Sequence, residues 1–130
     1  MKLGHQTLLE LYACKQDLLN DQAFIQKTLI EAAEVAKATI VKQYFHQFSP
    51  YGISGTLIIT ESHINIHTWP EHNFAAVDFF TCDFDMKIDD ACAYLKKVFE
   101  AKEVIKHDHK RGSMALIQKL GASQTQNHHQ

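Results

Sequence analysis

The hydrophobic pattern along the chain switches between strand-like alternation and helix-like periodicity. Alternating apolar and polar positions over residues 4–13 predict a first strand. From Asp21 to Lys37, apolar residues recur every three or four positions, which predicts an amphipathic helix. Asn20 or Asp21 can cap its first turn. The same spacing from Ile88 to Phe99 predicts a second helix.

Five further segments have the composition of strands, because they are rich in β-branched and aromatic residues and are separated by short polar turns. They cover residues 39–47, 55–60, 63–68, 74–82 and 102–107. The resulting order, β-α-β-β-β-β-α-β, joins most strands by short connections, which favours antiparallel pairing. We therefore expect an α+β fold: a two-layer sandwich with a mostly antiparallel sheet and two helices on one face.

The second face of such a sheet would remain uncovered. Aromatic residues of the strands offer more apolar surface than two helices are expected to hide: Tyr12, Tyr44, Phe45, Phe48 and Phe80. A second copy packed sheet on sheet would cover this surface. The pattern thus predicts a homodimer.

Length and composition narrow the class of protein. The 130 residues are 45% hydrophobic and 22% charged, which is typical of one globular domain, predicted over residues 1–122. The polar residues 123–130 predict a disordered tail. A net charge of −2 without a basic stripe argues against a nucleic-acid partner, and no apolar run approaches the ~20 residues of a membrane span. Three widely spaced cysteines without a C-x-x-C motif indicate the reducing cytoplasm.

Reactive residues gather between Ser54 and Cys82, inside segments that are predicted to be strands. This stretch contains Glu61-Ser62-His63, His67-Thr68-Trp69-Pro70-Glu71 and Thr81-Cys82. Departures from local sequence rules concentrate at functional sites. A lone serine on a strand is ordinarily a plain strand residue, so these neighbours are what make Ser62 a candidate nucleophile.

These runs resemble the small prokaryotic class of the pyruvoyl-dependent S-adenosylmethionine decarboxylase family. The resemblance covers about residues 3–112 and includes Gly4-His5, Glu10-Leu11-Tyr12-Ala13-Cys14, Pro50-Tyr51-Gly52-Ile53-Ser54-Gly55, Ala75-Ala76-Val77-Asp78 and Phe80-Thr81-Cys82. It implies an inactive precursor that cuts itself between Glu61 and Ser62, giving a β chain of residues 1–61 and an α chain of residues 62–130. The α chain would begin with a pyruvoyl group made from Ser62. Neither a metal nor pyridoxal phosphate is implied, and the implied assembly is a dimer of αβ units.

The resemblance also assigns roles to individual residues. In processing, the Ser62 hydroxyl would attack the Glu61 carbonyl, with Ser54 assisting and His67 accepting the α-proton. In catalysis, the pyruvoyl carbonyl would form a Schiff base with the amine of S-adenosylmethionine, and the Cys82 thiol would return a proton after CO2 leaves. Substrate binding would involve Phe48 and His67 beside the adenine, Ile64 and Trp69 around the pocket, and Glu71 at the ribose hydroxyls. The product would be the aminopropyl donor of polyamine synthesis.

Other reactive residues have simpler interpretations. Cys14 and Cys92 are expected in the core, since Cys92 lies on the apolar stripe of the second predicted helix. His63 and His67 have the four-residue spacing of a metal-binding pair on a helix, but they lie in a predicted strand. The remaining histidine pairs are expected at the surface: His107 and His109 near the last strand, and His128 and His129 in the tail. We therefore predict no metal site.

Two alternatives remain open at this stage. His72-Asn73 follows Glu71 where Tyr-Gly is common in the family, and Asp83 follows Cys82 where glycine is common. These polar residues leave room for arginine or ornithine as the substrate of the same chemistry, although Glu71 favours a substrate with a ribose. The second alternative is an uncleaved, inactive homologue that regulates a partner.

Overall fold

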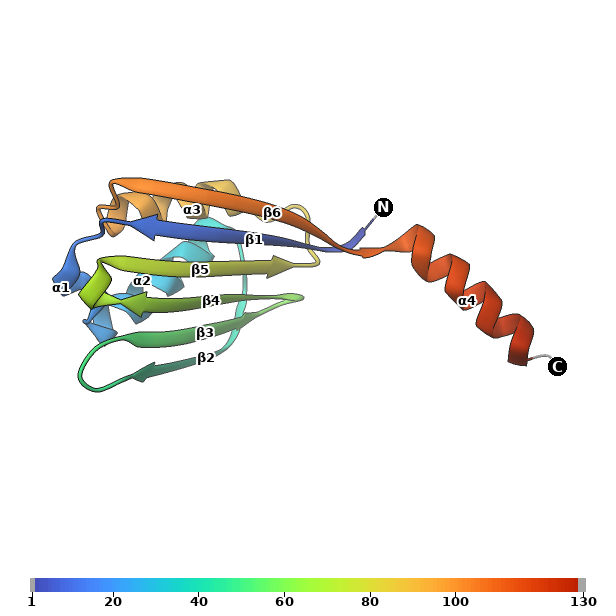
Figure 1. The fold of residues 1–130 in the computed structure, drawn as a ribbon, viewed down its shortest axis with the longest axis horizontal. Helices are drawn as coiled ribbons and strands as arrows, with labels where there is room; N and C mark the ends of the chain where they lie inside the picture. Colours follow the sequence, from blue (N-terminus) through green and yellow to red (C-terminus); the bar gives the residue numbers. More distant parts are fainter. Residues whose placement is uncertain (1, 129–130) are drawn as a thin grey trace.

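The computed structural model describes residues 2–128 and is built around one six-stranded sheet (Figure 1). The strands are β1 (Lys2–Tyr12), β2 (Ile40–Gln47), β3 (Ile53–Ile59), β4 (Ser62–Trp69), β5 (Phe74–Thr81) and β6 (Glu103–Ser113). Their order across the sheet is β2-β3-β4-β5-β1-β6, and every neighbouring pair is antiparallel. Strand β1 thus lies between β5 and β6, far from β2, which follows it in the chain.

Two helices cover one face of this sheet, α2 (Gln22–Val35) and α3 (Ile88–Val98) (Figure 1). The Asp21 side chain accepts a hydrogen bond from the Phe24 N–H at 3.1 Å and caps α2, as the sequence predicts. A short helix α1 (Gln16–Leu19) and a 3-10 turn η1 (Pro70–His72) lie at one end of the sheet. The predicted α+β sandwich with two helices on one face is confirmed.

The hydrophobic core fills the space between the sheet and these helices. Alternate residues of the four inner strands, β1, β3, β4 and β5, point into it. The largest fully buried side chains include Leu9, Leu11, Leu57, Ile64, Ile66, Phe79, Ile25, Leu29 and Phe99. Each such side chain contributes roughly 1.5–3 kcal/mol relative to exposure. The core therefore fixes which residues of each strand must face the opposite side of the sheet.

We call the side of the sheet without helices the open face. Tyr44 is 62% exposed and Trp69 is 40% exposed there. The prediction that Phe45 belongs to the same surface is wrong, because Phe45 packs against the core and its ring covers Gly55. The register of β2 against β3 shifts between Ile40 and Lys42, and a one-residue shift moves the following side chains to the opposite face.

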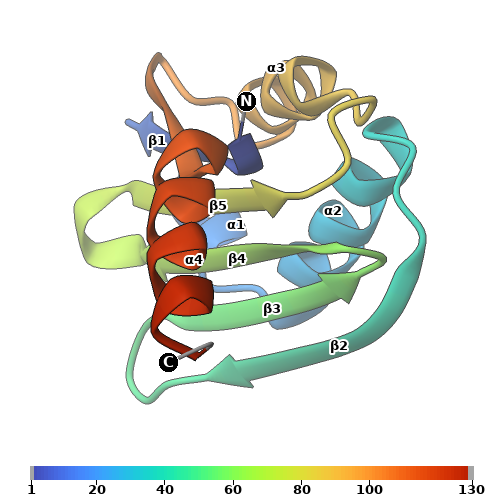
Figure 2. The same ribbon diagram turned by 90° about the vertical axis from the view of Figure 1, so that its right-hand side faces the viewer.

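The C-terminal region differs from the predicted disordered tail. Strand β6 continues to Ser113, and helix α4 (Met114–His128) follows directly and projects away from the sheet (Figures 1 and 2). The Ser113 Oγ accepts a hydrogen bond from the Leu116 N–H at 3.3 Å, which caps the helix. The predicted tail overlaps this helix up to His128, and residues 129 and 130 lie outside the described part of the chain. Within residues 2–128, no helix has both the length and the apolar character needed to cross a bilayer.

Candidate active site

The peptide bond that precedes Ser62 lies in a tight hairpin between β3 and β4. Ile59 pairs with Ser62, so Thr60 and Glu61 alone form the turn. Glu61 has a φ of 61°, in the left-handed region that residues with a Cβ avoid. This conformation costs about 1–2 kcal/mol. The backbone strain therefore lies in the residue whose carbonyl a Ser62 hydroxyl would attack.

The end of β5 holds both reacting groups of this hairpin. The Ser62 Oγ donates a hydrogen bond to the Thr81 Oγ1 at 2.8 Å. The Glu61 carbonyl oxygen accepts one from the Cys82 backbone N–H at 3.0 Å. An N–H at this position withdraws electrons from the carbonyl and can stabilise the oxyanion of a tetrahedral intermediate. Thr81, the last residue of β5, and Cys82, which follows it, thus hold the nucleophile and the oxygen of its target.

Cys82 lies beside this hairpin at the surface. It is an exposed free cysteine, and it lines one surface pocket with Glu61, Ser62, His63 and Phe80. The His63 and Phe80 rings stack there, with centroids 5.4 Å apart and an angle of 10° between their planes. The structure therefore brings the predicted nucleophile and the predicted proton donor to the same place.

A second group forms on the open face. Ser54 and His67 are directly paired across β3 and β4, and the Ser54 Oγ lies 2.7 Å from the His67 Nδ1. The centroid of the Trp69 ring lies 6.2 Å from that of the His67 ring and 5.5 Å from that of the Phe74 ring. Both residues predicted to assist processing are hydrogen-bonded to each other, next to one predicted substrate contact.

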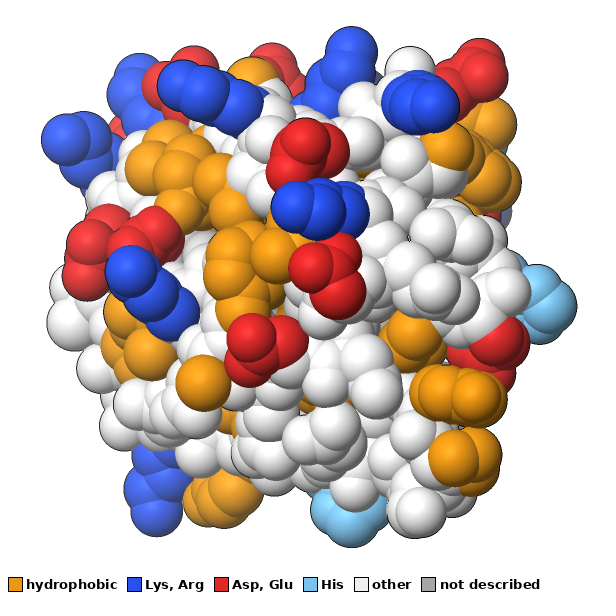
Figure 3. Space-filling view, turned by 90° about the vertical axis from the view of Figure 1, so that its left-hand side faces the viewer, with side chains coloured by type: hydrophobic (Ala, Val, Ile, Leu, Met, Phe, Trp, Pro, Cys, Tyr) orange, Lys and Arg blue, Asp and Glu red, His pale blue; other side chains and the backbone are white. Residues whose placement is uncertain are grey.

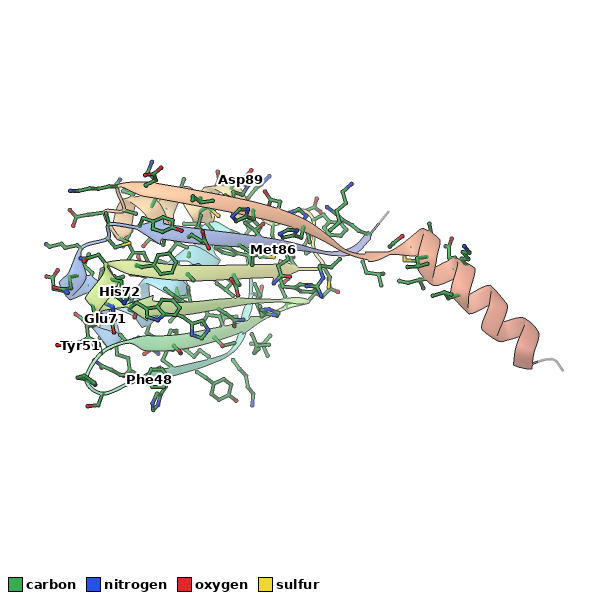
Figure 4. All side chains as sticks on the ribbon, in the orientation of Figure 1. Phe48, Tyr51, Glu71, His72, Met86 and Asp89 are labelled. Atoms are coloured by element: carbon green, nitrogen blue, oxygen red, sulfur yellow. The ribbon has the colours of Figure 1, made fainter. Side chains whose placement is uncertain are left out.

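Predicted substrate contacts extend this second group to the end of the sheet where α1 lies. Figure 4 shows Phe48 and Glu71 near that end, away from Met86, which contacts the Ser62 hydroxyl. Glu71 lines a pocket there together with Gln16, Asp17, Asn20, Tyr51 and Pro70. Seen from that end, the surface has acidic and basic side chains interspersed with small hydrophobic patches (Figure 3).

Ile64 does not join these surface residues. It is 0% exposed and lies in the core, because it alternates with His63 and Asn65 and so points toward the helices. The alternation of Ile64 and Ile66 with polar neighbours is visible in the sequence and would have predicted this placement.

The two groups of reactive residues do not meet within one chain. Ser62 and His67 are five positions apart on β4, which corresponds to about 16 Å along a strand. The Ser62 side chain also lies on the side of the helices with Thr81, whereas His67 is exposed on the open face. One chain thus brings Ser62 together with Cys82, and Ser54 together with His67, but not one pair with the other.

The remaining cysteines lie in the core, as predicted. Burial raises the pKa of Cys14 to about 11, and it raises that of Cys92, which also lies near Asp89 and Asp108, to about 11. Both thiols are therefore protonated near neutral pH. Among the described residues, no group of three or more His, Cys, Asp or Glu side chains is arranged to hold a metal ion.

A serine that follows a strained residue, with its hydroxyl and the preceding carbonyl both held by hydrogen bonds, is the arrangement that a self-processing serine precursor requires. The fold and the hairpin together therefore define a self-processing precursor that is cut before a serine. The family model described as S-adenosylmethionine decarboxylase matches residues 5–112, which is most of the chain. The chain therefore belongs to the S-adenosylmethionine decarboxylase family.

Individual relatives agree with this assignment. The chain is 47% identical over 115 residues to the "S-adenosylmethionine decarboxylase proenzyme" of Acidithiobacillus ferrooxidans, covering 88% of this chain and 86% of that protein. It is 43% identical over 122 residues to the protein of the same name from Clostridium kluyveri, covering 94% and 97%. The crystal structure of the adenosylmethionine decarboxylase from Aquifex aeolicus superposes with a TM-score of 0.80 at 34% identity, over 87% of this chain and 93% of that chain.

A more distant structure shares the fold alone. The AdoMetDC-delta26 monomer of Trypanosoma brucei has a TM-score of 0.61 at 17% identity, over 78% of this chain and 44% of that chain. The same fold is thus found within a longer chain.

Proposed function

We propose that this chain is the precursor of a pyruvoyl-dependent enzyme that decarboxylates S-adenosylmethionine for polyamine synthesis. The family assignment over residues 5–112 supports the decarboxylase activity, and relatives at 43–47% identity carry the name of its proenzyme. The observation that carries the self-processing step is the hairpin in which the strained Glu61 precedes Ser62.

Self-processing would convert the peptide bond into an ester and then break that ester. The Ser62 Oγ forms a bond to the Glu61 carbonyl carbon, the C–N bond breaks, and the hydroxyl proton ends on the freed amine. His67, assisted by Ser54, then removes the Ser62 α-proton, and the Cβ–O bond breaks to leave a Glu61 carboxylate. Water hydrolyses the resulting enamine through its imine and releases ammonia. The β chain would be residues 1–61 and the α chain residues 62–130.

The mature site would use the remaining side chains for decarboxylation. The pyruvoyl group made from Ser62 supplies an electron sink for the carbanion left when CO2 departs. Its fit here is supported by the half-buried position of Ser62 in the pocket that Cys82 lines. The Cys82 thiol would protonate the α-carbon. Phe48 and Trp69 on the open face, and Glu71 at the end of the sheet beside α1, would bind the nucleoside, without a contribution from Ile64.

A homodimer of αβ units would unite the separated groups. Two protomers related by a two-fold axis, packed through their open faces, can bring opposite ends of the sheet together. Each site would then take Ser62 and Cys82 from one protomer and Ser54 and His67 from the other. The exposure of Tyr44 (62%) and Trp69 on the open face supports this packing.

Separate observations support the location of the enzyme, its substrate and its catalytic activity. Three free cysteines support a location in the reducing cytoplasm. S-adenosylmethionine is preferred over arginine or ornithine because the relatives are named for it. An uncleaved regulator is disfavoured because Ser54, Ser62, His67 and Cys82 are all present.

The intact mass of the purified protein tests the proposal. We expect two fragments separated at Glu61–Ser62. The larger fragment should lack a free N-terminal amine, because it begins with the pyruvoyl group, and its carbonyl should react with hydrazine. The Ser62→Ala variant should remain one chain, whereas its cleavage at the same bond would refute the assignment. CO2 release from S-adenosylmethionine, arginine and ornithine then identifies the substrate, and equal release from arginine would contradict our preference.

Co-expression of two inactive precursors tests the shared site. Neither Ser62→Ala nor His67→Ala should complete processing alone. Together they form mixed dimers in which one site has both an intact Ser62 and an intact His67, so the His67→Ala chain should be cut. Cleavage that stays absent in verified mixed dimers would exclude a site shared between protomers.

A further inference from the structure

Thr81 is a buried polar residue whose hydroxyl has a complete set of partners. It is 3% exposed and lies at the end of β5, directly across from Ser62. Its Oγ1 lies 2.8 Å from the Ser62 Oγ, 2.9 Å from the Asp83 N, 2.9 Å from the Asp83 carbonyl O and 3.2 Å from the Met86 Sδ. No other side-chain oxygen of the described residues contacts the Ser62 hydroxyl.

The partners of Thr81 determine where the Ser62 proton points. The Thr81 hydroxyl has two acceptors within reach, the Asp83 carbonyl at 2.9 Å and the Met86 Sδ at 3.2 Å. Thioether sulfur is a weak acceptor, so the Thr81 hydroxyl donates to the carbonyl, which has no hydrogen to give. The Asp83 N–H donates to one lone pair of the Thr81 Oγ1. The remaining lone pair then accepts the Ser62 proton, and the lone pairs of the Ser62 Oγ are left free for attack.

We propose that Thr81 is the positioning residue of the first step of self-processing, in which the Ser62 Oγ bonds to the Glu61 carbonyl carbon. Its hydroxyl fixes the side-chain rotamer of Ser62 and draws the hydroxyl proton away from the attacking lone pair. The Ser62 hydroxyl proton ends on the Ser62 nitrogen when the bond between that nitrogen and the Glu61 carbonyl carbon breaks, so the step needs no other reactant. This inference rests on the proposed function, because it concerns the same cleavage.

Met86 cannot replace Thr81 in this role. Its Sδ lies 3.5 Å from the Ser62 Oγ, and thioether sulfur is a weak acceptor. Asp83, which stands where the family commonly has glycine, acts on Thr81 through its backbone N–H and carbonyl. The clamp on Thr81 therefore does not depend on the side chain at position 83.

The test compares Thr81→Val with Thr81→Ser during cell-free synthesis, by following the loss of full-length chain with time. Valine keeps the shape but has no hydroxyl, so we expect processing about tenfold slower or more, from the loss of one hydrogen bond to the nucleophile. Serine should restore a rate within about threefold of the wild-type rate. Met86→Leu, the matched control, should be processed at nearly the wild-type rate.

Hydroxylamine, which cleaves esters, identifies the step that is affected. The Thr81→Val precursor should stay resistant because it remains an amide, whereas His67→Ala should accumulate a sensitive ester. An ester in Thr81→Val, or wild-type cleavage rates in it, would overturn the role of Thr81 while leaving the proposed function intact. If the wild-type chain itself is never cut, the proposed function fails instead.

Folding of the variant is checked separately. The circular dichroism and thermal midpoint of Thr81→Val are compared with those of Ser62→Ala. If the valine variant does not fold, Thr81→Ser and Thr81→Cys decide the matter, since both are small but only serine offers a strong acceptor. Faster processing of the serine variant supports the inference, and equal rates overturn it.

Discussion

The strain at Glu61 gives a prediction that separates backbone conformation from side-chain chemistry. Glu61 has a φ of 61°, and a residue with a Cβ pays about 1–2 kcal/mol to adopt it. Glycine adopts the same conformation readily. Conversion to the ester lengthens the linkage between residues 61 and 62 by one atom, which lets the two-residue turn relax. The strain therefore raises the precursor in free energy relative to the ester.

The matched variants are Glu61→Gly and Glu61→Ala, because both lack the carboxylate and only alanine keeps the Cβ. If the strain is released by the transition state, 1–2 kcal/mol corresponds to about 5–30-fold slower processing of the glycine variant. The assay follows conversion of full-length chain into two fragments during cell-free synthesis. In a Ser62→Ala background, the glycine variant should unfold at a temperature no lower than the alanine variant. Glycine processing as fast as alanine processing would refute the reasoning.

Three further predictions concern other residues. Cys82→Ala should still be cleaved, because its backbone N–H to the Glu61 carbonyl remains, but CO2 release should fall by about 100-fold or more; full activity would remove Cys82 as the proton donor. Alkylation of folded Ser62→Ala protein at pH 8, analysed by mass spectrometry, should modify Cys82 before the buried Cys14 (3% exposed) and Cys92 (7% exposed), whose pKa values are about 11; equal rates would contradict their burial. Burial alone would raise the pKa of Asp108, but hydrogen bonds from His5, Thr7 and Lys106 lower it from 3.8 to about 2. The resulting stabilisation is fully present above the unfolded-state pKa of 3.8 and is lost as the pH falls through the folded-state pKa of about 2. Asp108→Asn should therefore lower the free energy of unfolding, measured by urea titration, by roughly 1 kcal/mol at pH 7, a value discounted because the side chain is 41% exposed, and by less below pH 3.8. A loss that does not vary with pH would contradict the coupling.

Several features follow from local sequence alone. Alternation predicts the strands, the three-to-four-residue spacing predicts α2 and α3, and Asp21 is a correct cap because capping depends on residues a few positions apart. The reactive residues could be found because they interrupt strand segments in a recognisable order. The sequence does not predict helix α4, because this segment lacks a strong periodic apolar stripe, and the helix projects away from the sheet instead of packing on it.

The tertiary structure decided the contacts between distant segments, since strand order and register depend on which surfaces are buried together. Placing β5 beside β4 is what sets Thr81 opposite Ser62 and the Cys82 N–H on the Glu61 carbonyl. A one-residue shift in β2 turned Phe45 into the core. The sequence by itself therefore determined the strands of the sheet, the two helices that cover it and the reactive groups, whereas only packing determined which of those groups lie within bonding distance.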